Sequence, residues 1–105
     1  MTGITRGSSN VFADIGLPDP ETHVVKADLV RRIASLIESQ GLNQIEAAER
    51  MGMSQPDVSK MLKGQFRPIS IERLMRCLVA LGQCVTIDVR APGKQAMPEI
   101  RVTTR

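Results

Sequence analysis

The sequence predicts a mostly α-helical domain that ends in one or two short β-strands. Apolar residues recur at helical spacing between residues 19 and 82, and glycines follow the periodic stretches. The period changes to two in CVTIDVR, residues 84–90, where apolar and polar side chains alternate. The chain has 105 residues, which suffices for one small domain. We therefore expect a flexible segment 1–18, a helical domain 19–82, and strands with a tail 83–105.

A short apolar cluster interrupts the polar N-terminal segment. Residues 1–10 are rich in glycine and serine, which is typical of a mobile terminus. The cluster ends at Pro18 and is too short to fold alone, so we expect it to dock on the domain or on a partner. Its members are Val11, Phe12, Ile15 and Leu17.

The first long helix is expected to begin at Asp19 and Pro20 and to end near Gln40, before a glycine. Its inward stripe follows helical spacing through Val30, Ile33 and Ile37, with two leucines alongside.

Residues 44–63 read as two short helices joined by a tight turn. Asn43 can cap the first helix while Glu46 reaches back to it, as in a capping box. Gly52 stands where the chain must turn, since glycine tolerates a positive φ. Ser54 can cap the second helix. The pattern is that of a helix-turn-helix.

The second helix of this motif keeps a polar face outside. Val58 and Met61 point inward, and Pro56 falls in the first turn, where a missing N–H is harmless. A polar exposed face suits a helix that reads bases in the DNA major groove. The residues predicted to contact bases are Gln55, Asp57, Ser59 and Lys60.

Basic residues gather on and after this second helix. Residues 50–76 carry a net charge of +4, whereas the rest of the chain sums to −1. Such a concentration favours a polyanionic partner, here double-stranded operator DNA. The residues predicted to contact phosphates are Gln44, Ser54, Lys63 and Arg67.

The last predicted helix spans residues 71–81, capped by Ser70 and ended by a glycine. The strand 84–90 follows, and Ile100 and Val102 alternate with polar residues as a second strand. A lone strand leaves unpaired edges. It can pair with a second copy in a homodimer or with the tail in an internal hairpin. The dimer interface is predicted at Val85, Ile87 and Val89.

The residue types that support catalysis or metal binding are scarce. His23 is the single histidine and is expected to be a solvated residue of the first helical turn. Cys77 and Cys84 lack the spacing of a metal site and are expected to be buried, reduced thiols. No phosphate-binding loop is present. We therefore expect neither an enzyme nor a cofactor.

No segment predicts export or membrane insertion. The N-terminus lacks basic residues followed by an apolar run, and no stretch approaches the ~20 apolar residues of a membrane span. We expect a cytoplasmic protein.

The motif resembles the phage-repressor-like (Xre) family of helix-turn-helix regulators. The residues that carry this resemblance are a glutamine opening the first helix, small residues within it, glycine at the turn, and Ser-Gln leading the second helix. Pro56 departs from the pattern, because the family often places a base-reading side chain there. Only an apolar contact, such as one to a thymine methyl, is open to it.

Residues 8–90 as a whole resemble the HigA-like antitoxins within this family. The features are SSNVFADIGLPDPE at residues 8–21, the motif 44–63 and the strand CVTIDVR. The resemblance implies a dimeric repressor of its own operon that also binds a RelE-like, mRNA-cleaving toxin. The apolar cluster around Phe12 would then contact the toxin, or else staple the domain. The alternatives are a stand-alone or prophage repressor and a protein-interaction module with a vestigial helix-turn-helix.

Overall fold

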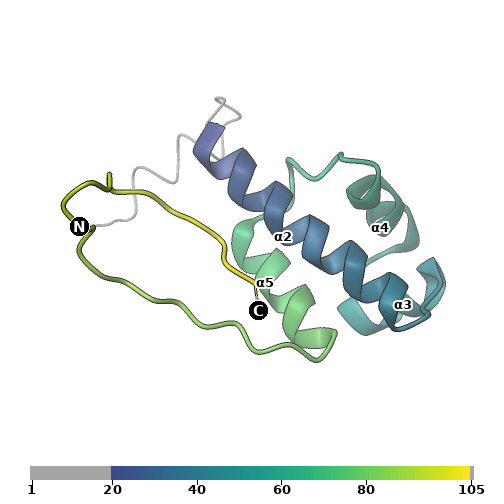
Figure 1. Ribbon diagram of the computed structural model, residues 1–105. Helices are drawn as coiled ribbons and strands as arrows, with labels where there is room; N and C mark the ends of the chain where they lie inside the picture. Colours follow the sequence, from purple (N-terminus) through teal and green to yellow (C-terminus); the bar gives the residue numbers. More distant parts are fainter. Residues whose placement is uncertain (1–19, 105) are drawn as a thin grey trace.

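The computed structural model describes residues 20–104, and this part of the chain contains four α-helices (Figure 1). Helix α2 lies across the others and packs on α5 and α4, while α3 packs on α4 and α5. The helices begin and end within one residue of the predicted positions. They are α2 (Pro20–Ser39), α3 (Gln44–Met51), α4 (Gln55–Leu62) and α5 (Ile71–Ala80).

The core is aliphatic, and its centre lies between α2, α4 and α5. Ile33 of α2 is fully buried, as are Val58 and Met61 of α4 and Leu74 of α5. Phe66 adds the aromatic ring of this core from the loop between α4 and α5. No polar or charged side chain among the described residues is buried. Apolar burial therefore supplies the main stabilisation of the fold.

The predicted C-terminal β-strands are wrong, because residues 83–104 form no strand and the described chain is all-helical. The segment leaves α5, turns around residues 94 and 95, and returns without pairing its two legs (Figure 1). An extended segment becomes a strand only when a neighbour accepts and donates backbone hydrogen bonds. The alternation of apolar and polar residues in 84–90 does not by itself provide a neighbouring strand.

The returning tail docks on α2 instead. The Ile100 N–H donates to Glu21 Oε2 at 3.4 Å, and Val102 is half-buried against the core. The outward leg makes no such contact, and Ile87 and Val89 are 73% and 88% exposed.

The N-terminal apolar cluster of Val11, Phe12, Ile15 and Leu17 lies outside the described residues. Between residues 20 and 104, no helix is long and apolar enough to cross a membrane.

Candidate nucleic-acid interface

The first helix of the motif, α3, is capped at both ends as predicted. Asn43 Oδ1 accepts from the Glu46 N–H at 2.8 Å, and Glu46 Oε1 accepts from the Asn43 N–H at 3.0 Å. This capping box satisfies two donors of the first turn. At the other end Gly52 adopts the left-handed conformation with φ 66°, which an L side chain rarely adopts. The turn therefore depends on glycine.

The second helix of the motif, α4, is held rigidly against the core. Ser54 Oγ accepts from the Asp57 N–H at 3.2 Å, and Pro56 lies in the first turn. Val58 and Met61 are completely buried, so the helix cannot rotate without opening the core. Its opposite face is thus presented to solvent in one fixed orientation.

The four predicted base-contacting residues all lie on α4 and keep some exposure to solvent. Gln55 and Lys60 are exposed, and Ser59 is half-buried. Asp57 is also exposed, and it lines an open groove beside α5 with Met53, Arg73 and other residues. The outward surface of α4 thus includes Gln55, Asp57, Lys60 and part of Ser59.

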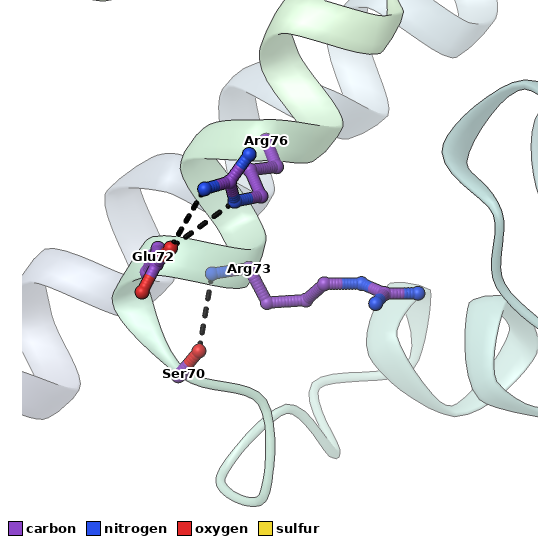
Figure 2. A network of polar contacts seen from close by, with 4 residues as sticks. All are labelled: Ser70, Glu72, Arg73 and Arg76. Carbon is purple, nitrogen blue, oxygen red and sulfur yellow. Dashed lines mark hydrogen bonds and ion pairs between the residues drawn. The ribbon is translucent and has the colours of Figure 1, made fainter.

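Arg73 of α5 ties the turn of the motif to the rest of the domain. Its Nη2 donates to the Gly52 carbonyl at 2.6 Å, while its backbone N–H donates to Ser70 Oγ at 3.0 Å. Figure 2 shows the Arg73 side chain extending away from α5, whereas Arg76 turns back to pair with Glu72. Sequence reasoning missed this role of Arg73, because no local pattern links an exposed arginine to a carbonyl 21 residues away.

The four predicted phosphate-contacting residues are all exposed and lie at helix ends or in a loop. Gln44 opens α3, Ser54 caps α4, Lys63 ends α4, and Arg67 lies in the loop that follows. Helix N-termini carry partial positive charge and free N–H groups, which suits Gln44 and Ser54 to anions.

The loop carrying Arg67 is fastened to α2. Lys26 Nζ donates to the Arg67 carbonyl at 2.9 Å, and the rings of His23 and Phe66 stack with centroids 5.1 Å apart. His23 is exposed in the first turn of α2, as predicted, but its stacking on Phe66 was not foreseen. The loop after α4 is thereby held in place, with the Arg67 side chain left in solvent.

The two cysteines differ in environment. Cys77 is buried, with its thiol 3.7 Å from Met53 Sδ, whereas Cys84 is exposed, contrary to the prediction. Cys84 follows the end of α5 and lies on the outward leg of the tail, which is exposed. Burial raises the pKa of the Cys77 thiol, and the charge and hydrogen bond of Arg73 oppose that rise. Within residues 20–104, no three metal-ligating side chains gather.

Comparison with known proteins identifies the family. A family model described as a helix-turn-helix domain matches residues 11–90. A solved structure assigned to the XRE family of transcriptional regulators is 35% identical, with a TM-score of 0.79, and the match covers 84% of this chain and all of that one. The chain belongs to the XRE family of helix-turn-helix transcriptional regulators. Among curated proteins, none matches the sequence.

Membership of the XRE family confirms the coarser prediction of a DNA-binding transcriptional regulator. The match at residues 11–90 extends beyond the motif 44–63 in both directions. It takes in the N-terminal apolar cluster and the segment with Val85, Ile87 and Val89. Those three side chains are exposed in the single chain.

Proposed function

We propose that this XRE-family regulator is a sequence-specific repressor whose α4 reads bases in the major groove. The observation that carries the proposal is the fixed outward face of α4, with Gln55, Ser59 and Lys60. Val58 and Met61 are buried on the opposite side of α4, so the helix backbone that carries this face is already oriented before DNA arrives. A preformed face loses less conformational entropy on binding.

The residue types on this face suit base recognition. The Gln55 amide can form a bidentate pair with adenine, in which it donates to N7 and accepts from the N6 amino group. Lys60 can donate to guanine O6 or N7. Asp57 can accept from a cytosine amino group. Pro56 offers apolar contact alone. The protein acts by binding, with no catalytic step.

Phosphate contacts would fix the register of α4 on the duplex. Gln44 and Ser54 present helix N-termini, while Lys63 and Arg67 present positive charge at the opposite end of α4. If phosphates of the DNA backbone held both ends of α4, the outward face of α4 would lie over the bases.

The test is selection of duplex sequences by the full chain, followed by titration of the selected duplex and a random duplex over a salt series. We expect preference for the selected sequence and a steep loss of affinity with salt on both duplexes. Failure to bind any duplex at low salt would reject the proposal and favour a protein-interaction module.

We further propose that the chain is a homodimeric, HigA-like antitoxin that represses its own operon and neutralises a RelE-like toxin. Residues 8–21 and the segment 84–90 support it by resemblance, and the exposure of Val85, Ile87 and Val89 supports a partner at that surface. The toxin contact is proposed at Val11, Phe12, Ile15 and Leu17.

Co-expression tests the antitoxin role. If the adjacent reading frame encodes a small basic RelE-like protein, this chain should rescue growth and co-purify with it. Deletion of residues 1–17 should abolish co-purification while operator binding and melting temperature persist. Toxin binding that survives the deletion would place the contact elsewhere. A neighbour without toxicity would favour a stand-alone repressor.

A further inference from the structure

Among the described residues of the C-terminal tail, the last ones make the contacts with the helical domain. The Ile100 N–H reaches Glu21 near the start of α2, and Val102 packs against the core. Val102 and Thr104 also line a hollow with four residues farther along α2, namely Asp28, Arg31, Arg32 and Ser35. Residues 99–104, here called the anchor, thus run along α2 from its first turn onward.

The connection between α5 and the anchor is much longer than its path requires. It leaves from Leu81, whose carbonyl accepts from Gln40 Nε2 at 2.8 Å beyond the last turn of α2. It arrives at the opposite end of α2, beside Glu21. The rise of a helix puts these ends roughly 28 Å apart, whereas the chain from residue 81 to residue 100 can span about 60 Å. The connection therefore has slack.

This connection is exposed to solvent along its whole length from residue 84 to residue 98. Among the described residues, the polar contacts of this segment are internal: the Ala96 N–H donates to the Gly93 carbonyl at 3.0 Å, and Arg90 pairs with Asp88 at 3.4 Å. Figure 1 shows the connection standing clear of the helices. It exposes large apolar side chains, with Ile87, Val89 and Met97 at 73%, 88% and 78%. One copy of the chain leaves this apolar surface in water, at a free-energy cost.

We propose that two copies of the chain exchange their anchors, so that residues 99–104 of each lie on α2 of the other. The proposal rests on the homodimer proposed above and assigns its geometry. The same contacts form in either arrangement, so exchange loses none of them, and exchange of an identical element is a low-cost route to a two-fold dimer.

Exchange also gives the apolar connection a partner. The two connections cross between the copies side by side, and the side chains left exposed in one copy then contact those of the other. These are Val85, Ile87, Val89 and Met97. The hollow under the anchor is lined from α2 and the tail, without α3 or α4. Both reading helices therefore stay free for one duplex.

Cross-linking between two differently tagged copies tests the exchange. Both copies carry Cys84→Ser, which leaves only the buried Cys77. One copy adds Thr104→Cys in the anchor and the other adds Ser35→Cys on α2. The copies are co-expressed and treated with a short bismaleimide. The matched control replaces Ser35→Cys with Glu49→Cys, an exposed position on α3, and each copy's melting temperature is checked against the parent.

We expect a covalent link between the two tags for the pair at 104 and 35, and none for the pair at 104 and 49. A single chain carrying both Thr104→Cys and Ser35→Cys that links only within itself, with no link between tags, would overturn the exchange. Light scattering and duplex titration on the same samples separate the two proposals. A dimer that binds the selected duplex without the link between tags rejects the exchange and keeps the proposed function.

Discussion

Arg73 and Gly52 are joined by a hydrogen bond of 2.6 Å from the guanidinium Nη2 to the backbone carbonyl. The bond crosses from the first turn of α5 to the turn between the two motif helices. The Gly52 carbonyl stands at the negative end of the α3 dipole, where a cation is favourable. Gly52 is also the first residue of the turn that leads into α4. Arg73 therefore holds the turn before α4 in place relative to α5.

Replacing Arg73 by Gln should weaken DNA binding through this positioning role. The charge and the long reach to Gly52 are both lost, so we expect the free energy of unfolding to fall by about 1 kcal/mol, the scale of one exposed hydrogen bond. Affinity for the selected duplex should fall more than affinity for a random duplex, because the orientation of α4 matters only for base contacts. Chemical denaturation and duplex titration measure the two effects.

The matched control for that variant is Arg76→Gln on the same helix. Arg76 pairs only with exposed Glu72, at 3.0 Å, and an exposed pair of this kind contributes little. Both variants remove one positive charge from α5. Equal losses of affinity in the two would show that Arg73 acts through its charge and not through Gly52.

Gln55→Ala should cost about 1–3 kcal/mol on the selected duplex and relax discrimination at one base position. The amide is exposed at the start of α4, where a reading helix approaches base edges. Gln65→Ala, in the exposed loop after α4, is the control and should leave discrimination unchanged. Equal weakening of Gln55→Ala on selected and random duplexes would reject a base-reading role.

The helices and their caps could be predicted because their causes are local. Asn43, Gly52, Ser54 and Ser70 each act on backbone groups within a few residues, and all four have the predicted roles. The contacts that position the interface are long-range and could not be read this way. The Arg73 bond to Gly52 spans 21 residues, and the stacking of His23 on Phe66 joins α2 to a distant loop.

The C-terminal strands failed for a related reason. Alternation at residues 84–90 specifies which side chains share a face, but a strand also needs a neighbour at hydrogen-bonding distance. Within residues 20–104, the returning end of the tail makes its contacts with α2 and not with the outward leg of the tail. The alternation of apolar and polar residues was therefore not sufficient to predict a strand.

Lys63→Ala should weaken binding to all duplexes alike and lower the slope of log affinity against log salt by about one. Lys63 is exposed at the C-terminal end of α4, and each phosphate contact releases about one counterion. Lys94→Ala removes the same charge from the tail connection and should leave the slope intact. An unchanged slope for Lys63→Ala would show that this side chain stays in solvent when DNA binds.

The two thiols should react with an alkylating reagent at widely different rates. Cys84 is exposed and should be modified within the time of an ordinary labelling experiment. Cys77 is buried, and burial raises its pKa, so it should resist until the domain unfolds. Mass spectrometry of digested protein, with and without denaturant, measures each site. Comparable labelling of both cysteines without denaturant would contradict a closed core around Cys77.

The raised pKa of Cys77 also makes the fold sensitive to alkali. The folded state keeps this proton to a higher pH than the unfolded state does, so its contribution to stability is complete below the ordinary thiol pKa. As the pH rises above that value, the unfolded thiol ionises first and the free energy of unfolding falls. A Cys77→Ala variant loses this part of the pH dependence, although the smaller side chain lowers its stability throughout. Denaturation from neutral to alkaline pH should therefore bring the stability curves of the parent and of Cys77→Ala together.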